Sequence, residues 1–128
     1  MRGYMDEVYL AAVAEAFSRK AGMYDAFGEN HPLLQRMREK VRQHVLRHLH
    51  PGARILEMNA GSGSDAVFFG NLGYTVHATD LAPGMVSKIE EKAARYGLTD
   101  RLSCQRLDFH RLDQARGVPF DYVFSNMG

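Results

Sequence analysis

The feature that most constrains this chain is a glycine-rich turn, Gly61-Ser62-Gly63, set between two short apolar runs. Residues 55–58 form the first run, and residues 75–79 form the second, which ends in Asp80. Between them, residues 65–71 have the composition of a short helix. This order predicts a strand, a tight turn, a helix and a second strand.

The same alternation continues downstream. Pro83 and Gly84 open a predicted helix that runs to about Tyr96, and strands are expected at residues 102–107 and 120–125. Strands that alternate with helices predict an α/β fold, a Rossmann-like, doubly wound and mostly parallel sheet. Right-handed crossovers place the carboxyl ends of the strands along one edge, where ligands bind in such sheets.

The first part of the chain has a different pattern. Residues 1–50 predict a helical lead-in or cap, and residues 51–128 predict the Rossmann-like domain. Residues 5–20 are rich in helix formers. Apolar side chains then recur at three- and four-residue spacing over residues 33–49, which predicts an amphipathic helix.

The predicted fourth strand ends shortly before Gly128, so no crossover helix follows it. A strand edge without a neighbour is a template for pairing with another chain. We therefore expect a domain that is truncated after its fourth strand, with a free sheet edge that favours a homodimer.

Charge and hydropathy argue against several classes of protein. The net charge of +1 gives no bulk field for nucleic acid, and no apolar run is long enough to span a membrane. The first ten residues include Asp6 and Glu7 and lack the layout of a signal peptide. The single cysteine, Cys104, lies in a predicted strand, which favours a buried and inert thiol. These features predict a cytoplasmic protein without nucleic-acid or membrane partners.

The glycine turn has three interpretations. Small residues at a strand-to-helix turn are often only tight-turn chemistry. Residues 61–66 also match the G-x-G-x-x-A form of the dinucleotide fingerprint, with Asp80 placed for a ribose. Asp65 and Glu57, however, flank the turn without a nearby lysine or arginine to offset them, and would repel a diphosphate. S-adenosylmethionine has no phosphate and a net positive charge, so an acidic turn favours it.

Taken together, the motifs resemble the cofactor-binding half of the class I S-adenosylmethionine-dependent methyltransferases. The first motif of that family has an acid two residues before a G-x-G-x-G run. Here Glu57 holds the place of the acid, and Asn59 replaces the first glycine. Asparagine tolerates left-handed backbone angles better than most residues, so this departure is mild. The resemblance covers residues 54–128.

The resemblance implies a role for each strand end. Glu57 and the turn would hold the methionine part of the cofactor, and Asp80 the ribose hydroxyls. Leu81 and Met85 would line the adenine, and Asp108 would take its amino group. The residues that the resemblance assigns to the cofactor are Tyr24, Glu57, Asn59, Ala60, Gly61, Ser62, Gly63, Asp80, Leu81, Met85, Asp108, Phe109 and Asn126.

Other interpretations of these residues stay open at this stage. Asp80 would otherwise cap the helix that follows it, Asp108 would be a solvated loop acid, and Glu57 would pair with a lysine or arginine. Tyr24 would be an ordinary packing residue.

Histidines and basic residues in the lead-in give weaker signals. His44, His48 and His50 lack a recognisable set of metal ligands, so no metal site is predicted. The basic run over residues 36–47 is interpreted as the solvated face of an amphipathic helix. No catalytic residue is identified.

The function that these patterns favour is methyl transfer from S-adenosylmethionine to a small-molecule acceptor. The alternatives are an NAD-dependent oxidoreductase that uses the same turn, and a cofactor-binding fragment without catalysis.

Overall fold

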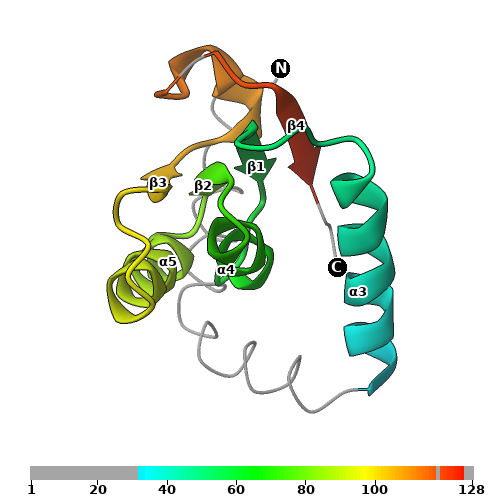
Figure 1. Ribbon diagram of the computed structural model, residues 1–128. Helices are drawn as coiled ribbons and strands as arrows, with labels where there is room; N and C mark the ends of the chain where they lie inside the picture. The colour runs from blue at the N-terminus through cyan, green and yellow to red at the C-terminus, as the bar shows by residue number, and fades with distance from the viewer. Residues whose placement is uncertain (1–31, 118, 126–128) are drawn as a thin grey trace, which may run out of the picture.

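The computed structural model describes residues 32–117 and 119–125, and Figure 1 shows a parallel sheet flanked by helices. The sheet has four strands in the order β3-β2-β1-β4. The elements, in chain order, are α3 (Pro32–Leu46), β1 (Arg54–Met58), α4 (Ser64–Asn71), β2 (Thr75–Asp80), α5 (Pro83–Arg95), β3 (Leu102–Arg106), the 3-10 helix η1 (Phe109–Gln114) and β4 (Tyr122–Ser125).

Every strand pairing in the sheet is parallel, which confirms the predicted Rossmann-like α/β fold. Ile55 of β1 pairs with Val76 of β2 on one side and with Tyr122 of β4 on the other. The chain moves outward from β1 through α4, β2 and α5 to β3, and then returns to place β4 on the opposite side of β1. The strand order therefore reverses at β1, and ligands of open α/β sheets bind at such a switch point.

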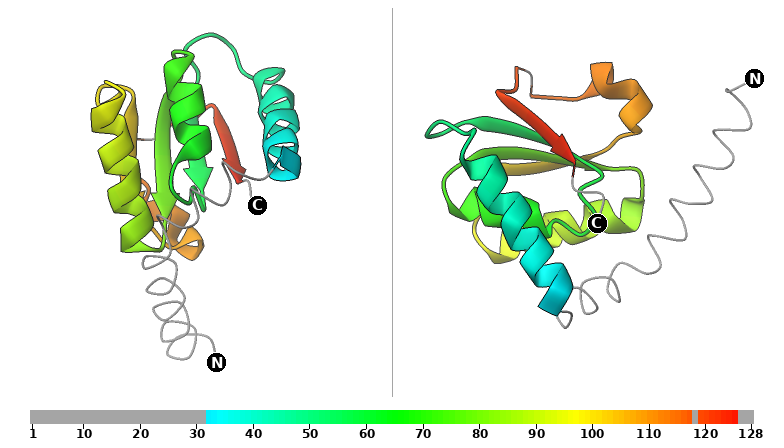
Figure 2. Two further views of the ribbon diagram at one scale, coloured as in Figure 1. Left: turned by 90° about the horizontal axis from the view of Figure 1, so that it is seen from below. Right: turned by 90° about the vertical axis from the view of Figure 1, so that its right-hand side faces the viewer.

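One face of the sheet carries the main hydrophobic core. Phe69 of α4 is fully buried and packs edge-to-face against Phe124 of β4, with 5.7 Å between the ring centroids. Ile89 of α5 and Val45 of α3 belong to the same core. Figure 2 shows α3 beside β4 and α5 at the other end of the sheet. The predicted lead-in thus contributes α3 to the core of the sheet domain.

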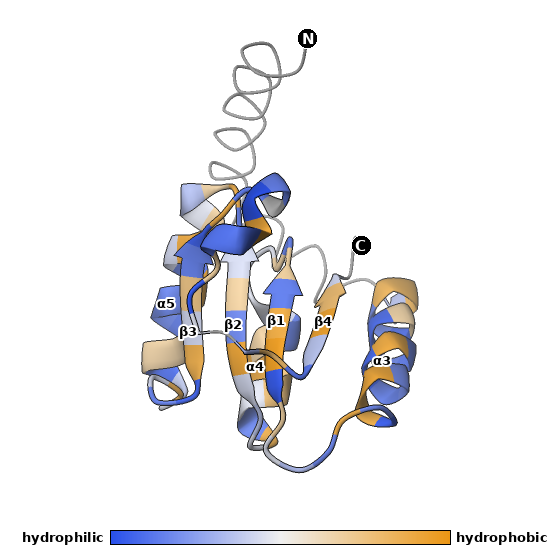
Figure 3. Cartoon of the chain, turned by 90° about the horizontal axis from the view of Figure 1, so that it is seen from above, coloured by the Kyte–Doolittle hydropathy of each residue, from blue (hydrophilic) through white to orange (hydrophobic). Residues whose placement is uncertain are grey.

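The opposite face has a smaller core around Leu56 and Leu107. A polar cluster adjoins it, in which the ring nitrogens of His77 contact Ser103 Oγ at 2.7 Å and Gln105 Oε1 at 2.9 Å. Burial lowers the pKa of His77. Figure 3 shows η1 near the carboxyl ends of β2 and β3. Because ligands of parallel sheets bind at the carboxyl ends of the strands, the cofactor residues are expected at this end of the sheet.

Several element boundaries differ from the predictions. The helix over residues 33–49 ends at Leu46, since the next residues form a turn in which His48 N donates to Val45 O. The fourth strand begins at Tyr122, two residues later than predicted. The predicted helix over residues 5–20 lies outside the described residues.

Candidate functional site

The glycine turn after β1 is built from backbone conformations that few side chains allow. Gly61 has a φ of 61° and Gly63 a φ of 90°. Asn59, with a φ of 53°, is the one non-glycine residue with a positive φ in the described part of the chain. Asparagine therefore occupies a left-handed position where the family motif has glycine. Ala60 N donates to Thr79 O at 2.9 Å, which ties the turn to β2.

Asp80 connects this turn to the loop after β2. Its Oδ2 accepts a hydrogen bond from Gly61 N and its Oδ1 accepts one from Ala82 N, each at 2.9 Å. Burial raises the pKa of Asp80, and the backbone hydrogen bonds oppose that shift. Because Ala82 directly precedes α5, the alternative of a helix cap is part of what Asp80 does. A carboxylate has about four acceptor sites, so capacity for a ribose diol remains.

Glu57 is the most unusual side chain of the site. It is 1% exposed, and its Oε1 is a buried oxygen with no hydrogen-bond partner. Burial raises the pKa of Glu57 well above its usual range; Asp65 and Asp80 raise it further, and Arg42 lowers it. A buried, unsatisfied carboxyl oxygen beside a ligand turn suits a ligand that brings a positive charge. The alternative of a direct ion pair with lysine or arginine is not observed among the described residues.

The sequence-based charge argument needs a correction at Asp65. Arg42 of α3 lies close by, and its Nε is 2.7 Å from Asp65 Oδ1. Asp65 is 6% exposed, so it does not border the turn as an open carboxylate. The prediction that no arginine offsets these acids is therefore wrong, because α3 folds against the first turn of α4. The remaining acidic groups at the turn are Glu57 and Asp80.

The residues predicted for adenine lie at the same edge. Met85 is 2% exposed and packs with Ala82, and Leu81 is the partly buried member of this cluster. Leu81 O accepts a hydrogen bond from Arg106 Nε at 3.0 Å. The structure thus places Leu81 nearer to solvent than Met85, and their adenine contacts stay predictions.

Asp108 directly precedes η1 and acts as its cap. Its Oδ1 accepts a hydrogen bond from His110 N at 2.9 Å. The loop-acid alternative for Asp108 therefore describes part of its role, and its contact with adenine stays a prediction. Phe109 begins η1, and its side chain is not described. Tyr24 and Asn126 lie outside the described residues.

Two further residues reach the turn without having been predicted. Ser125, at the end of β4, accepts a long hydrogen bond of 3.4 Å from Asn59 Nδ2. Thr79 Oγ1 donates to Glu57 O at 2.9 Å. Both contacts come from neighbouring strand ends, so the strand order would have indicated them. Ser62 is 2% exposed and lies inside the turn.

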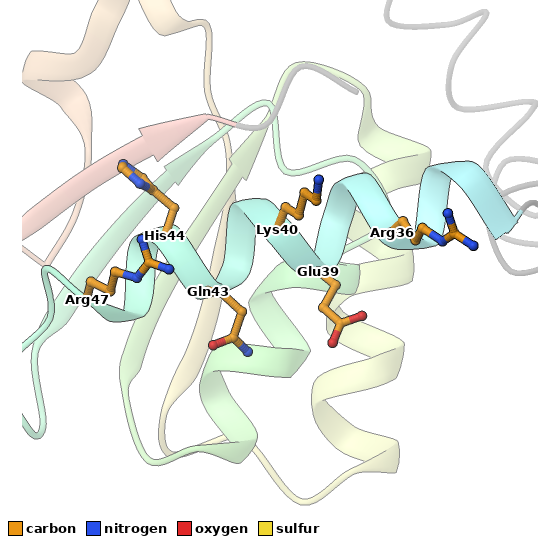
Figure 4. A pocket seen from close by; sticks show the side chains of 6 residues that line it. All are labelled: Arg36, Glu39, Lys40, Gln43, His44 and Arg47. Carbon is orange, nitrogen blue, oxygen red and sulfur yellow. The ribbon is translucent and has the colours of Figure 1, made fainter.

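A separate pocket of about 570 Å³ lies along α3, and Figure 4 shows the side chains that line it. None of the predicted cofactor residues belongs to the described lining, which is Arg36, Glu39, Lys40, Gln43, His44 and Arg47. The rings of His44 and His48 meet edge-to-face, with centroids 4.9 Å apart. Among the described residues no cluster of three or more potential metal ligands occurs, and no described helix is long and apolar enough to cross a membrane.

The parallel sheet, its switch point and the acid-flanked glycine turn define a Rossmann-like domain for a nucleoside cofactor. A family model described as "Methyltransferase domain" matches residues 55–128. The chain belongs to this methyltransferase family, and the predicted resemblance to class I S-adenosylmethionine-dependent methyltransferases is confirmed.

Sequence relatives match parts of the chain, and the description of one of them supports this assignment. A malonyl-[acyl-carrier protein] O-methyltransferase from Serratia marcescens is 38% identical over 93 residues, which are 71% of this chain and 34% of that protein. An uncharacterized protein from Mycobacterium tuberculosis is 37% identical over 78 residues, 61% of this chain and 27% of that protein. The chain spans about a third of the length of the curated relatives it matches.

Solved structures share the fold. A putative sarcosine dimethylglycine methyltransferase from Galdieria sulphuraria has a TM-score of 0.64 at 22% identity, covering 72% of this chain and 36% of that one. The CcbJ methyltransferase from Streptomyces caelestis has a TM-score of 0.58 at 25% identity, covering 66% and 33%. The comparisons give no support to the oxidoreductase alternative.

Proposed function

We propose that this chain is the S-adenosylmethionine-binding part of an enzyme that methylates a small-molecule acceptor. The observation that carries the proposal is the buried carboxyl of Glu57, whose Oε1 has no hydrogen-bond partner beside the glycine turn. An ammonium group supplies both the charge and the hydrogen bond that this oxygen lacks. Family membership independently supports methyl transfer.

The residues of the chain hold and orient the cofactor in this proposal. Asp80 is fixed by two backbone N–H groups and accepts the ribose hydroxyls. Glu57 receives the ammonium of the methionine part. Leu81 supplies apolar surface for the adenine. When bound, S-adenosylmethionine supplies an electrophilic methyl group, and positioning it is the main contribution of this part of the protein.

The acceptor is proposed to be small, and a carboxylate oxygen is the first acceptor atom to test. Relatives from Serratia marcescens and Pectobacterium atrosepticum are described as malonyl-[acyl-carrier protein] O-methyltransferases.

The predicted cytoplasmic location and homodimer stay proposals as well. Among the described strands β4 pairs only with β1, so its other edge is free to pair with a second copy of the chain. Sedimentation of the wild type and of a variant with a charged residue at Val123, which is 49% exposed, tests this dimer, since the charge should weaken it.

Calorimetry with S-adenosylmethionine and with NAD tests the proposal. We expect heat of binding with S-adenosylmethionine and none with NAD. Heat with NAD alone would overturn the proposal in favour of the oxidoreductase. Binding without turnover on a panel of carboxylates would favour the non-catalytic alternative.

A further inference from the structure

Arg42 of α3 makes three contacts with the beginning of α4. Its Nε lies 2.7 Å from Asp65 Oδ1, and its Nη2 donates to Ser64 Oγ at 2.9 Å. The guanidinium carbon also lies 4.6 Å from the centroid of the Phe68 ring. Ser64 and Asp65 lie in the first turn of α4 and Phe68 in the second, so this one side chain links α3 to the beginning of α4 beside the core contacts of Val45 and Phe69.

The helix that Arg42 holds follows directly from the glycine turn. Gly63 precedes α4 and has no side chain with which to cap it. Asp65 is nearly buried, and a buried carboxylate without its cation is strongly unfavourable. The position of the first turn of α4, and of the backbone N–H groups before it, therefore depends on Arg42.

Arg42 also acts on the carboxyl of Glu57. The groups that influence Glu57 are Asp65 from α4, Asp80 from β2 and Arg42 from α3, and of these only Arg42 lowers its pKa. The charged form of Glu57 is the form that receives a ligand ammonium. Arg42, which lies outside the predicted Rossmann-like domain, thus favours the charged form of Glu57 that binds the ligand ammonium.

We propose that Arg42 is a positioning residue of the cofactor site, which couples the docking of α3 to the affinity for S-adenosylmethionine. The inference rests on the proposed function, because it concerns the same ligand. It differs from that function in assigning part of the binding strength to a residue of the lead-in whose hydrogen-bond, ion-pair and ring partners, within the described ranges, all lie in α4. Arg36, on the exposed side of α3, provides a matched control.

The test measures the dissociation constant of S-adenosylmethionine by calorimetry from pH 6 to 8.5, together with the melting temperature. Arg42→Gln is expected to weaken binding about tenfold at pH 7 and to move the pH midpoint of affinity upward. Arg42→Lys keeps the charge without the planar fork, so its midpoint stays near that of the wild type while its affinity falls less. Arg36→Gln leaves both quantities unchanged.

Asp65→Asn should shift the pH midpoint in the opposite direction, and it tests the inference even if Arg42→Gln does not fold. Removal of the Asp65 charge lowers the pKa of Glu57, so the midpoint moves downward, and in the double variant it returns toward the wild-type value. The ionisable groups of S-adenosylmethionine titrate identically with every variant, so a difference between the pH midpoints of two variants arises from the protein. Unmoved midpoints, or equal affinity in Arg42→Gln and Arg36→Gln, overturn the inference. Failure of the wild-type chain to bind would instead refute the proposed function.

Discussion

Replacing Gly63 with alanine is expected to destabilise the fold through two separable effects. Gly63 has a φ of 90°, and a Cβ built there would lie 2.9 Å from Ile89 Cγ1, with Ile89 Cβ 3.5 Å away. Ile89 is fully buried in the main core, so it has little room to move. Left-handed backbone strain and overpacking both destabilise the folded state, and the stiffer unfolded chain offsets a small part of this. The free energy of unfolding should therefore fall by about 2–4 kcal/mol.

Thermal unfolding followed by circular dichroism measures this loss. For a domain of this size about 1 kcal/mol corresponds to about 4 °C, so the melting temperature should fall by about 8–16 °C. Gly52→Ala is the matched control, since Gly52 has a φ of 72° but no atom within 4 Å of an added Cβ. Its loss should be about 1 kcal/mol, from backbone strain alone.

The contact with Ile89 can be isolated in a second background. In Ile89→Ala the side chain that Gly63→Ala would strike is shortened, so the further loss from Gly63→Ala should approach that of Gly52→Ala. If Gly63→Ala costs no more than Gly52→Ala in the wild-type background, the packing argument is refuted.

Three other measurements have defined outcomes. Asp80→Asn should weaken S-adenosylmethionine at least tenfold in calorimetry, because a charged hydrogen-bond pair contributes about 1.5–3 kcal/mol; unchanged affinity would argue against the ribose contact. Burial raises the pKa of Glu57 in the folded chain above the ordinary value of 4.5. The protonated Glu57 side chain therefore gives its full contribution to stability below pH 4.5, and this contribution is lost as pH rises through the pKa of the folded state. The melting temperature of the wild type should therefore fall relative to Glu57→Gln as pH increases from 4.5, and parallel profiles would contradict this. Burial also raises the pKa of Cys104 from 9.0 to about 11, so at pH 8 its reaction with a disulfide reagent should be about a hundredfold slower in the folded chain than in urea; equal rates would show that the thiol is not protected.

The fold was predictable because its signals are local. The apolar runs at residues 55–58 and 75–79, the glycines between them and the acid at Asp80 each follow from neighbouring residues. Their order along the chain then limits the topology to a parallel sheet with its ligand edge at the strand ends. The left-handed angle of Asn59 follows from the same kind of local chemistry.

The role of Arg42 was not predictable in this way. It lies in a basic run whose other members are mostly solvent-exposed, and its partner Asp65 is 23 positions away. The helical spacing places Arg42 beside the apolar Val45 and Leu46, but it does not identify Asp65 as the partner. The pairing depends on how α3 docks on α4, which is a property of the packed core around Val45 and Phe69. Asp108 shows the same limit, because its capping of η1 requires the loop conformation.

The position of β4 beside β1 affects how the chain matures on the ribosome. Arg54 N donates to the carboxylate of Asp121, 67 positions later, at the start of this pairing. At a translation rate of about 5–20 residues per second, β1 therefore waits roughly 3–13 s with one bare edge before its second neighbour emerges. Asn59 meets Ser125 only after that interval, so the glycine turn lacks this contact, and β1 is open to misassembly, until β4 is released.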